Sequence, residues 1–569
     1  MHSLRRVVLG FHLGHDRCAA LVIDGKVIAA ISQERLDRRK YSISDSIPLE
    51  AIYYVLKQAE VCADDISDIA FTHAGCPVTS RIEESWGQEV LLALNLADRP
   101  VTMVGHHLAH AYSAFYTSPF RQAAIAVADG GGDIPNDDWC EAESFYTADE
   151  SGLRLVANRF QNNTIKYGTA LAVERFDYMP QSIRVCQISV GRKYQQVTQL
   201  LGFKFGQAGK TMGLAPYGSP FLPFQPSING FRLDLSYGDY LDRLDDAQKR
   251  SRQPYSIFLR QNRARIAYDI QEFTTTTLLG FLRHLRRATG MSSVCMAGGV
   301  FLNCAANGRI VKESGFSEVY IVPSAGDDGQ AIGAALYVYH VGKHQPKRFD
   351  RFSPFLGRCY EDIEAINLAR KFEYPFHCFA SHAEMAQVVA GLLAQGRTAG
   401  LCRGRSEFGP RALGHRSILA SPLIPTMKDH INSRIKFRED FRPYAPLVKA
   451  EAAQQFFELA VQSPYMLLTA QVRPEHQHRL VAITHVDGSA RIQTLDKADD
   501  PFLYSLLEGF ETQTGYPVLL NTSFNTADEP IVETPADAFR TFRDAALDVL
   551  VFDRVLVGKD AALLPDDYA

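Results

Sequence analysis

Three histidines stand close together in the segment VGHHLAHAYSAFY, which runs from Val104 to Tyr116. The other residues of the segment are small or apolar, and a buried imidazole needs a partner for its ring nitrogens. In a helix, His106 and His110 would lie one turn apart on the same face. Two imidazoles in that arrangement can bind one metal ion, and they can equally cap a helix and face water. The spacing alone leaves both interpretations open.

Acidic loops elsewhere in the chain carry the other groups that a metal site needs. The loop ADGGGD (Ala128–Asp133) follows one predicted strand, and AGDDGQAIGAA (Ala325–Ala335) opens a predicted helix with two adjacent aspartates. Two imidazoles with one or two carboxylates suit Fe(II), Mn(II) or Zn(II). We predict as metal ligands His106, His110, Asp129 and Asp328. The pattern lacks the glutamate of a zinc peptidase motif, and His107 is expected to be a structural hydrogen-bonding residue.

A third loop favours phosphate. AGGVFLN (Ala297–Asn303) places a Gly-Gly turn before a predicted helix, where free backbone N–H groups can bind an anion. Each of the three loops, taken alone, is more simply a tight turn with a helix cap. Together with the histidine pair they indicate a site for a nucleotide and a metal. The chain contains neither a Walker loop nor a dinucleotide-binding fingerprint.

The C-terminal third of the chain is rich in cations. Arginines and lysines recur in segments that end predicted strands, and Arg can bind a polyphosphate through bidentate hydrogen bonds. The segments are Gly404–Pro422, Ile431–Pro446, His485–Leu495 and Leu519–Asn525. A network of surface salt bridges would give the same pattern, so phosphate binding and a solvated surface stay equally open.

The elements that must position these residues follow a repeated order. Strands are predicted at Arg6–Phe11, Cys18–Asp24 and Lys26–Glu34, with an Asp-Gly turn between the last two. The same order of three strands begins again at Ala123. The repeat indicates a duplicated α/β unit with a cleft between its halves, and ligands bind at strand ends in such sheets.

A loss of periodicity marks the end of this first region. The segment His340–Arg358 gains Pro, Gly and charge, which is typical of a linker, and a second α/β domain is predicted to begin near Phe376. We therefore expect a first domain at residues 1–345, a linker at 346–375 and a second domain at 376–569.

Composition excludes several classes of protein. The 569 residues are too many for one ordinary core, and 46% hydrophobic with 22% charged residues is typical of a globular protein. A net charge of −4 predicts no nucleic-acid and no membrane partner. No apolar stretch is long enough to span a bilayer and no signal peptide is predicted. The ten scattered cysteines indicate reduced thiols, so we expect a cytoplasmic protein.

Nine motifs run through nearly the whole chain. They are HHLAHAYSAFY, ADGGGD, GKTMGLAPYG, AGGVFLNCAANGRI, PSAGDDGQAIGAAL, EFGPRALGHRSILASP, RPYAP, HVDGSARIQTL and GYPVLLNTSFN. In type and order they resemble the O-carbamoyltransferases of the NodU/CmcH family, the TobZ-like enzymes that carbamoylate antibiotics and lipo-oligosaccharide signals.

The resemblance implies a duplicated ASKHA-type N-terminal domain, related to the tRNA threonylcarbamoyl transferase, and a YrdC-like α/β C-terminal domain. In such enzymes the C-terminal domain forms carbamoyl-adenylate from carbamoyl phosphate and ATP, which carries Mg. The intermediate passes inside the protein to the N-terminal domain. There the hydroxyl of a small-molecule acceptor, a natural product or sugar, takes the carbamoyl group and AMP leaves. The expected ion of the N-terminal domain is Fe(II) or another divalent metal, and the resemblance is compatible with a homodimer.

The resemblance also assigns roles to single residues. His15 and Lys40 are expected to be catalytic in the N-terminal domain, with His15 as the base for the acceptor hydroxyl, and Arg411 is expected to be catalytic in the C-terminal domain. A cap or turn role for His15 is an open alternative. The expected ATP and carbamoyl phosphate contacts are Arg411, Lys436, Arg442, Arg491, Asn521 and Ser523. The expected carbamoyl-adenylate contacts of the N-terminal domain are Gly130, Lys210, Gly298, Gly299, Asn303 and Asp327.

Two features depart from the family pattern. Asp528 stands where the family often has Gly, in the loop after Ser523. The segment Asn162–Phe203 is longer than the usual family link, and specificity for an acceptor is often built into such insertions.

Three other functions use related folds or chemistry. A tRNA carbamoyl- or threonylcarbamoyl-transfer enzyme would share the reaction, but the near-neutral charge argues against it. An ASKHA-fold sugar kinase would release ADP and would leave the Arg-rich second domain unexplained. A non-catalytic, Hsp-like ATP-binding module would have no use for a metal site.

Overall fold

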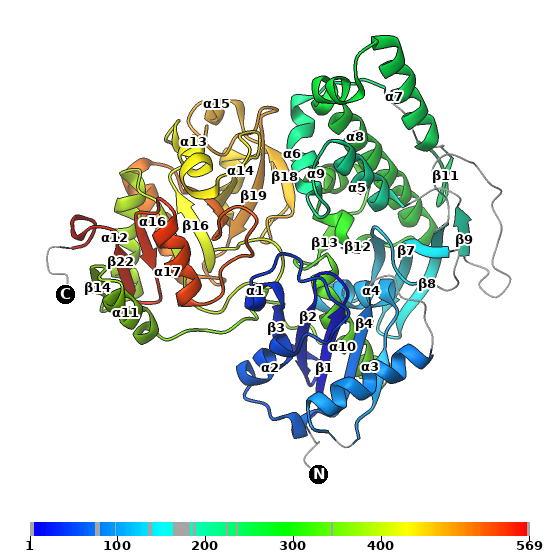
Figure 1. Cartoon of the computed structure of the whole chain (residues 1–569), viewed down its shortest axis with the longest axis horizontal. Coiled ribbons are helices and arrows are strands. Elements are labelled where there is room, and N and C mark those ends of the chain that lie inside the picture. Colours follow the sequence, from blue (N-terminus) through cyan, green and yellow to red (C-terminus); the bar gives the residue numbers. More distant parts are fainter. Residues whose placement is uncertain are drawn as a thin grey trace. The chain divides into compact units, whose positions relative to one another are not determined.

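The computed structural model of the chain divides into two compact units (Figure 1). The first comprises Met1–Gln33 and Tyr41–Ser353, and the second comprises Glu34–Lys40 and Pro354–Ala569. The structure describes residues 5–73, 80–96, 98–134, 139–162, 182–185, 189–222, 226–234, 237–342 and 345–565. Most of the long segment Asn162–Phe203 therefore lies outside the described residues.

The first unit contains two larger sheets that repeat one topology. The strand orders are β3-β2-β1-β4-β5 and, for the described residues of the other sheet, β13-β12-β6-β7-β8-β9. In each, the leading strand, β1 or β6, pairs antiparallel with the strand of the following hairpin and parallel with a later strand, β4 or β12. This repeat confirms the predicted duplicated ASKHA-type domain. The strands are β1 (Val7–Leu13), β2 (Cys18–Ile23), β3 (Lys26–Ser32), β4 (Asp68–His73), β5 (Val101–Met103), β6 (Ala123–Ala128), β7 (Trp139–Asp149), β8 (Gly152–Asn162), β9 (Ser182–Val185), β12 (Ser293–Ala297) and β13 (Glu318–Ile321).

Local sequence explains the hairpins of the first sheet. β2 and β3 pair antiparallel across Asp24 and Gly25, whose φ angles are 48° and 79°. Two successive positive φ angles fit the twist of a tight hairpin, and Asp and Gly tolerate them. The predicted Asp-Gly turn is therefore confirmed.

Two helices pack between the sheets of the first unit. α10 (Gln330–His340) packs on β1, β2 and β4, α4 (His106–Thr117) packs on β6 and β12, and the two helices pack on each other. Glycines permit this close approach, because a Cβ on Gly10 of β1 would lie 2.0 Å from the Ala331 oxygen, and one on Gly333 would lie 1.9 Å from the Ala109 oxygen. α4 is thereby fixed with its first turn at the carboxyl end of β6.

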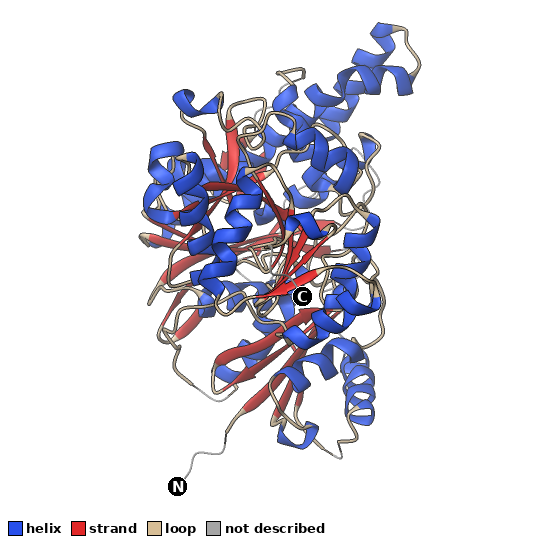
Figure 2. Cartoon of the chain, turned by 90° about the vertical axis from the view of Figure 1, so that its left-hand side faces the viewer, coloured by secondary structure: helices blue, strands red, loops and turns tan. Residues whose placement is uncertain are grey.

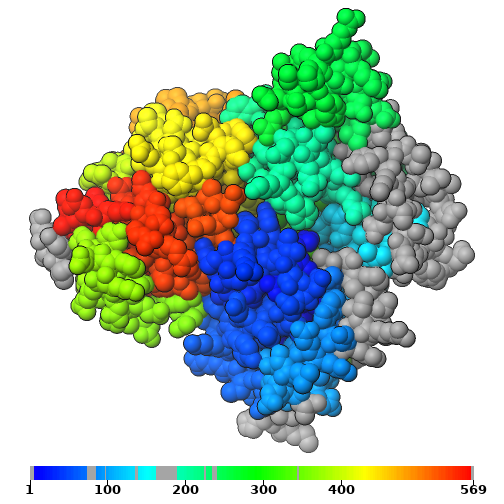
Figure 3. Space-filling model, in the orientation of Figure 1, coloured from blue at the N-terminus to red at the C-terminus, as the bar shows by residue number. Residues whose placement is uncertain are grey.

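The remaining helices of the first unit follow the strand hairpins. They are α2 (Leu49–Gln58), α3 (Ser80–Ala93), α5 (Val190–Leu200), α6 (Ala208–Leu214), α7 (Tyr237–Ser251), α8 (Tyr255–Thr289) and α9 (Cys304–Glu313), with a small hairpin of β10 (Ser227–Asn229) and β11 (Arg232–Asp234). α8 ends at Gly290, which has a φ of 69° and serves as a left-handed cap. In Figure 3 the connected ends of α7 and α8 stand out from the surface of this unit. None of the described helices is long and apolar enough to cross a membrane.

The second unit is an α/β structure built on one mixed sheet. Its described strands have the order β14-β22-β21-β15-β16-β20-β17-β19-β18. The strands are β14 (Phe376–Cys378), β15 (Ala399–Cys402), β16 (Arg416–Ala420), β17 (Ala445–Lys449), β18 (Leu468–Gln471), β19 (Ser489–Leu495), β20 (Val518–Ser523), β21 (Val549–Val551) and β22 (Val555–Gly558). The helices are α1 (Glu34–Asp37), α11 (Asp362–Lys371), α12 (His382–Ala394), α13 (Met427–Ile431), α14 (Ala453–Phe456), α15 (Pro474–Gln477), α16 (Pro501–Thr514) and α17 (Pro535–Asp544). The α/β class predicted for this region is confirmed, and its likeness to YrdC stays a prediction.

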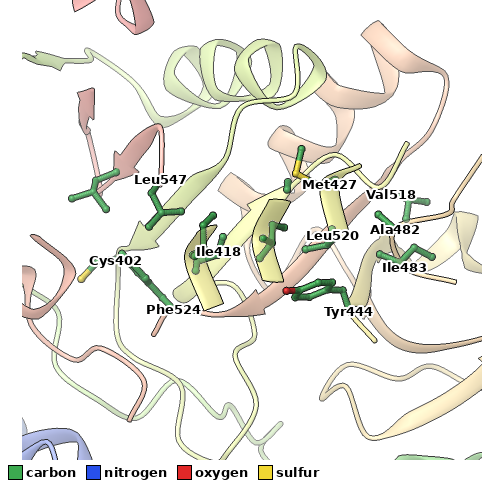
Figure 4. Close-up of a cluster of buried hydrophobic side chains, with 14 of the residues drawn as sticks. Cys402, Ile418, Met427, Tyr444, Ala482, Ile483, Val518, Leu520, Phe524 and Leu547 are labelled. Carbon is green, nitrogen blue, oxygen red and sulfur yellow. The ribbon is translucent and has the colours of Figure 1, made fainter. Parts of the chain in front are cut away.

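Apolar side chains cover both faces of the central strands of this sheet. On one face Ile418, Leu520 and Phe524 belong to a buried cluster that also includes Met427 and Tyr444 (Figure 4). On the other face the helices α12 and α16 pack together over Leu419 and Leu519. Figure 2 shows the strands of the chain in red and the helices that flank them in blue.

The short segment Glu34–Lys40 packs with the second unit although it follows β3 in the sequence. Arg35 is buried and donates to the Gly409 oxygen at 3.1 Å. Arg38 donates to the oxygens of Ile531 and Pro530 at 2.7 and 2.9 Å. The sequence assigned these residues to the first domain, because their partners lie some 370 to 490 positions away in the chain.

Candidate metal centre and anion site

Four side chains from three elements meet in the first unit. His106 and His110 come from the first turns of α4, Asp129 follows β6, and Asp327 begins a 3₁₀ turn before α10. The four ligand atoms lie within 4.8 Å of one another. The His106 Nε2 lies 3.3 Å from the Asp129 Oδ2 and 3.4 Å from the Asp327 Oδ1. The His110 Nε2 lies 3.2 and 3.3 Å from the same two oxygens.

One of the four predicted ligands differs. The structure brings His106, His110 and Asp129 together, but the second carboxylate is that of Asp327 and not of Asp328. Successive residues of a 3₁₀ turn point about 120° apart, so two adjacent aspartates cannot both face the same point. The group of converging atoms therefore includes Asp327, which the sequence expected among the carbamoyl-adenylate contacts, and the role of Asp328 as a ligand stays a prediction.

The distances fit a single metal ion. Metal bonds to imidazole and carboxylate are about 2.0–2.2 Å long, so neighbouring ligand atoms of a four- or six-coordinate ion lie about 3.0–3.5 Å apart. The four nitrogen-to-oxygen distances all fall in that range. Two imidazoles and two carboxylates also form a donor set that suits Fe(II), Mn(II) or Zn(II). The residues present therefore fit the divalent metal that the sequence predicts.

Opposite charges compensate within the cluster. Burial lowers a histidine pKa, but the charge of Asp327 and the interactions with Asp129 outweigh it, so the pKa of His106 lies well above its usual value and that of His110 is also raised. In return, and against the effect of burial, the histidines lower the pKa of Asp129 to about 2 and that of Asp327 well below its usual value.

His15 lies at the edge of this cluster. Its Nε2 is 3.3 Å from the Asp327 Oδ2, its Nδ1 is 3.1 Å from the Asp16 Oδ2, and its side chain is 36% exposed. Burial lowers the pKa of His15, but the charges of Asp327 and Asp16 outweigh it and raise that pKa to about 9. Its ring also meets the ring of Phe205 edge to face, with centroids 5.8 Å apart.

The other histidines near the cluster have structural partners. The Nδ1 of His107 lies 2.6 Å from the Ser144 Oγ, as expected for a hydrogen-bonding residue. His12, which the sequence analysis did not single out, has its Nδ1 2.7 Å from the Thr72 Oγ1 and its Nε2 3.7 Å from the Asp327 Oδ2. Burial lowers the pKa of both rings, that of His107 to about 4.

Several of the expected carbamoyl-adenylate contacts border the cluster. Gly298 has a φ of 97°, and a Cβ there would lie 2.2 Å from the Ala128 oxygen, while one on Gly299 would lie 3.2 Å from the Asp129 Oδ1. Gly130 donates its N–H to the Asp129 Oδ1 at 2.6 Å. Gly298 thus permits the close approach of its backbone to Ala128, and Gly299 lies close to the Asp129 carboxylate.

Asn303 and Lys210 lie on other elements of the first unit. The Asn303 Oδ1 caps α9 by accepting from the Ala306 N–H at 3.1 Å, and its Nδ2 donates to the Gln271 Oε1 at 3.0 Å. Lys210, on α6, has its Nζ 5.8 Å from the centre of the Phe203 ring.

The second unit holds a buried lysine at the end of a π-helical turn, Asn432–Lys436. Four oxygens lie within hydrogen-bond distance of the Lys436 Nζ, the backbone and side-chain oxygens of Ser523 at 2.7 and 3.2 Å and those of Asn525 at 2.9 and 2.5 Å. All four acceptors are uncharged. Burial, with the charges of Arg438, Arg442 and Lys40, lowers the pKa of Lys436 well below its usual value.

Further arginines surround this lysine. The guanidinium of Arg438 lies 4.3 Å over the Tyr444 ring, and burial lowers the pKa of Arg438 to about 10, with Arg442 and Arg491 acting in the same direction. Arg491 is paired with Thr469 in the register of β18 and β19. Three of the predicted phosphate contacts, Lys436, Arg442 and Arg491, are therefore close enough to Arg438 for their charges to influence one another.

The loop that carries Arg411 is fixed by buried amides. The Asn521 Nδ2 donates to the Ala412 oxygen at 3.2 Å and to the Gln493 Oε1 at 2.7 Å, and the Gln493 Nε2 donates to the Leu413 oxygen at 2.8 Å. Asn521 thus supports the loop with its amide nitrogen. Gln493 performs the same task, and no local signal in the sequence distinguishes it from other strand residues.

The structure shows the backbone conformation of Asp528 and the location of Lys40, two residues that the sequence analysis singled out. Asp528 has a φ of 59°, a conformation that Gly adopts readily and that Asp also tolerates. Lys40 lies in the segment that packs with the second unit, and its charge acts on Lys436, whereas the sequence expected Lys40 at the active site of the first domain. The structure thus groups Lys40 with the anion site.

Comparisons with known proteins identify the family of the chain. Family models of the carbamoyltransferase N-terminus and C-terminus match residues 89–336 and 390–559. Nodulation protein NolNO of Sinorhizobium fredii is 35% identical over 591 residues, which cover 98% of this chain and 80% of that protein. Nodulation protein NolO of Bradyrhizobium diazoefficiens is 35% identical over 484 residues, with 81% and 80% covered. The solved structure of full-length HypF in its phosphate- and nucleotide-bound form aligns with a TM-score of 0.39 and 13% identity, over 59% of this chain and 56% of that chain. The chain belongs to the carbamoyltransferase family and is a carbamoyltransferase.

Proposed function

We propose that the chain is an ATP-dependent O-carbamoyltransferase that works in two steps. In the second unit, water releases phosphate from carbamoyl phosphate, and an oxygen of the resulting carbamate attacks the α-phosphorus of Mg-bound ATP. Carbamoyl-adenylate forms and pyrophosphate leaves. In the first unit, the hydroxyl of a small-molecule acceptor attacks the carbamoyl carbon, the bond from that carbon to the phosphate oxygen breaks, and AMP leaves.

The observation that carries the first step is the environment of Lys436. The lysine is buried among four uncharged oxygens and its pKa lies well below the usual value, so a bound anion would stabilise its charged form. Adenylation builds negative charge on the α-phosphate and on the departing pyrophosphate, and fixed cations stabilise that charge best when they are in place beforehand. Arg411, Arg442 and Arg491 are the further candidates for the same phosphates, with Ser523 at the end of β20.

The second step uses the cluster of the first unit. His106, His110, Asp129 and Asp327 would hold a divalent ion, for which we propose iron, and such an ion neutralises a phosphate leaving group and orients the carbamoyl group. His15 stands at the edge of the cluster with part of its ring exposed, and we propose that it handles the proton of the acceptor hydroxyl. Gly130, next to Asp129, has open space where a Cβ would lie, and we propose that the adenylate binds beside this loop.

The test is an incubation of the purified protein with ATP and carbamoyl phosphate in the absence of an acceptor. The proposal predicts pyrophosphate and carbamoyl-adenylate, both lost in Arg411→Ala. ADP as the product would contradict it and would support a kinase. AMP that appears only when tRNA is added would move the acceptor from a small molecule to nucleic acid.

A further inference from the structure

We propose that Glu141 is a positioning residue of the metal centre, an inference that rests on the metal-binding role proposed above. Glu141 does not belong to the four-residue cluster. It lies on β7 and is buried, and it fixes the loop that carries Asp129 to the helix that carries His106.

The first link joins the loop to the helix. α4 begins after Gly105, a residue without a side chain to cap the helix. The carboxylate of Asp133 takes over this task, because its Oδ2 accepts from the His106 N–H at 2.9 Å. A carboxylate at a helix N-terminus satisfies a free N–H group and favours the local field. Asp133 therefore ties the loop that starts at Asp129 to the first turn of α4.

The second link joins Asp133 to Glu141. The Asp133 N–H donates to the Glu141 Oε2 at 3.1 Å, and the Glu141 N–H donates to the Asp133 oxygen at 2.9 Å. The N–H of Gly132 donates to the Glu141 oxygen at 3.1 Å. Gly132 fits closely here, since a Cβ would lie 2.6 Å from the Glu141 Oε2 and 2.7 Å from the His107 Cδ2. Three hydrogen bonds thus hold the end of the loop in one place.

The third link holds the Glu141 side chain itself. Its Oε1 accepts from the Asn158 Nδ2 at 3.2 Å, and its Oε2 lies 3.9 Å from the His107 Nδ1. Asn158 and His107 are both hydrogen-bonded to the side chain of Ser144, which lies on the same strand as Glu141. A buried carboxylate held by several donors has one defined position, and it restricts the positions of the groups that are hydrogen-bonded to it. Groups that orient metal ligands in this way typically change metal affinity by 10- to 100-fold when removed.

The experiment measures bound divalent metal and its affinity, by elemental analysis and by competition with a chelator, in the full-length protein. Glu141→Ala removes both carboxylate oxygens and is expected to weaken metal binding by at least about tenfold. Glu141→Gln keeps the shape and one acceptor oxygen and is expected to retain affinity within about threefold. Gly132→Ala removes no side chain of the network, but its Cβ would clash with Glu141 and His107 and force the loop or these side chains to move. It is therefore expected to weaken metal binding as Glu141→Ala does.

Asp269→Asn is the matched control. Asp269 is a buried carboxylate of the same unit that accepts from the N–H groups of Phe221 and Leu222 at 3.1 and 2.8 Å. Its substitution is expected to lower the unfolding temperature and to leave metal affinity unchanged. Folded Glu141→Ala with wild-type metal affinity would overturn the positioning role. Absence of bound metal in the wild-type protein would overturn the metal centre itself and, with it, this inference.

Discussion

His106 and His110 in the first unit face two carboxylates, whereas the Lys436 amine in the second unit lies within hydrogen-bond distance of four uncharged oxygens. In the first site the charges of the imidazoles and the carboxylates are balanced inside the cluster. In the second site burial lowers the pKa of Lys436, and the positive charges of Arg438, Arg442 and Lys40 lower it further.

This difference explains how one chain can serve two kinds of ligand. A cluster of acids and imidazoles loses protons and gains a cation, because its donor atoms already converge on one point. A buried lysine whose hydrogen-bond acceptors are uncharged favours an anion, because the anion stabilises the charged form of the amine. The two sites therefore predict opposite responses to substitution, and each prediction below tests one side of the comparison.

The largest effect is expected at the anion site. Lys436→Met keeps the length of the side chain but removes its charge, and pyrophosphate formation is expected to fall at least about a thousandfold, because a buried donor to the reacting phosphates is lost. Retention of divalent metal is expected to be unchanged. Lys497→Met, at an exposed lysine of the same unit, is the control and should leave both quantities as they are. Equal loss of metal in Lys436→Met would break the division between the sites.

The next prediction concerns the metal cluster and tests which of the two adjacent aspartates is a ligand. Asp327→Asn is expected to weaken metal binding about a hundredfold, because it removes a charged ligand atom from the cluster. Asp328→Asn, one position along the chain, should change metal affinity by less than about threefold. Both are measured by competition with a coloured chelator. A larger effect at Asp328 than at Asp327 would restore the ligand set that the sequence predicted.

A buried lysine in the first unit provides a contrast to Lys436. Burial, with the charge of Arg159, lowers the pKa of Lys193 to about 7, and its Nζ lies 4.9 Å from the centre of the Phe273 ring. The unfolded chain has the ordinary lysine pKa and binds more protons between pH 7 and about pH 10. Stability is therefore expected to rise with pH across this window and to fall as the pH drops towards 7.

Lys193→Met should remove that dependence. In the wild-type protein, unfolding in urea at pH 7.5 to 9.5 is expected to take up about one proton, and the variant should take up correspondingly less. Pyrophosphate formation should stay at the wild-type rate, because Lys193 belongs to the first unit and not to the anion site. A slope that does not differ between the two proteins would show that Lys193 is charged in the folded state.

The smallest effect concerns the segment Glu34–Lys40. Arg38→Ala removes two hydrogen bonds to backbone oxygens of the second unit, and the cost is expected to be about 1–2 kcal/mol of its unfolding free energy. Arg39→Ala, at the exposed neighbour, is the control and should be close to neutral. Urea unfolding followed by a probe in the second unit measures both. An unchanged midpoint in Arg38→Ala would mean that this segment adds nothing to the second unit.

The sequence predicts those parts of the fold that depend on local pattern. The spacing of His106 and His110 follows from the period of a helix, and the Asp-Gly turn at Asp24 follows from the backbone conformations that those residues tolerate. The repeated order of strands in the first unit is also a local pattern, because each hairpin carries its own alternation of buried residues and turn residues.

The missed parts depend on direction and on distant partners. Two adjacent aspartates are equivalent in sequence, and only the 3₁₀ turn decides that Asp327 faces the histidines. Asn525 is an acceptor for Lys436 from 89 positions away, and Glu141 reaches the metal centre through Asp133. Such contacts are set by tertiary packing, which periodicity and motif spacing do not encode.

The most direct test of the two-site account is pyrophosphate formation by Asp327→Asn after removal of its metal, measured with ATP and carbamoyl phosphate and without acceptor. The account predicts the wild-type rate of pyrophosphate release, because adenylation is assigned to the second unit. Loss of pyrophosphate release together with the metal, or release of ADP in its place, would contradict the division of the reaction between the two units.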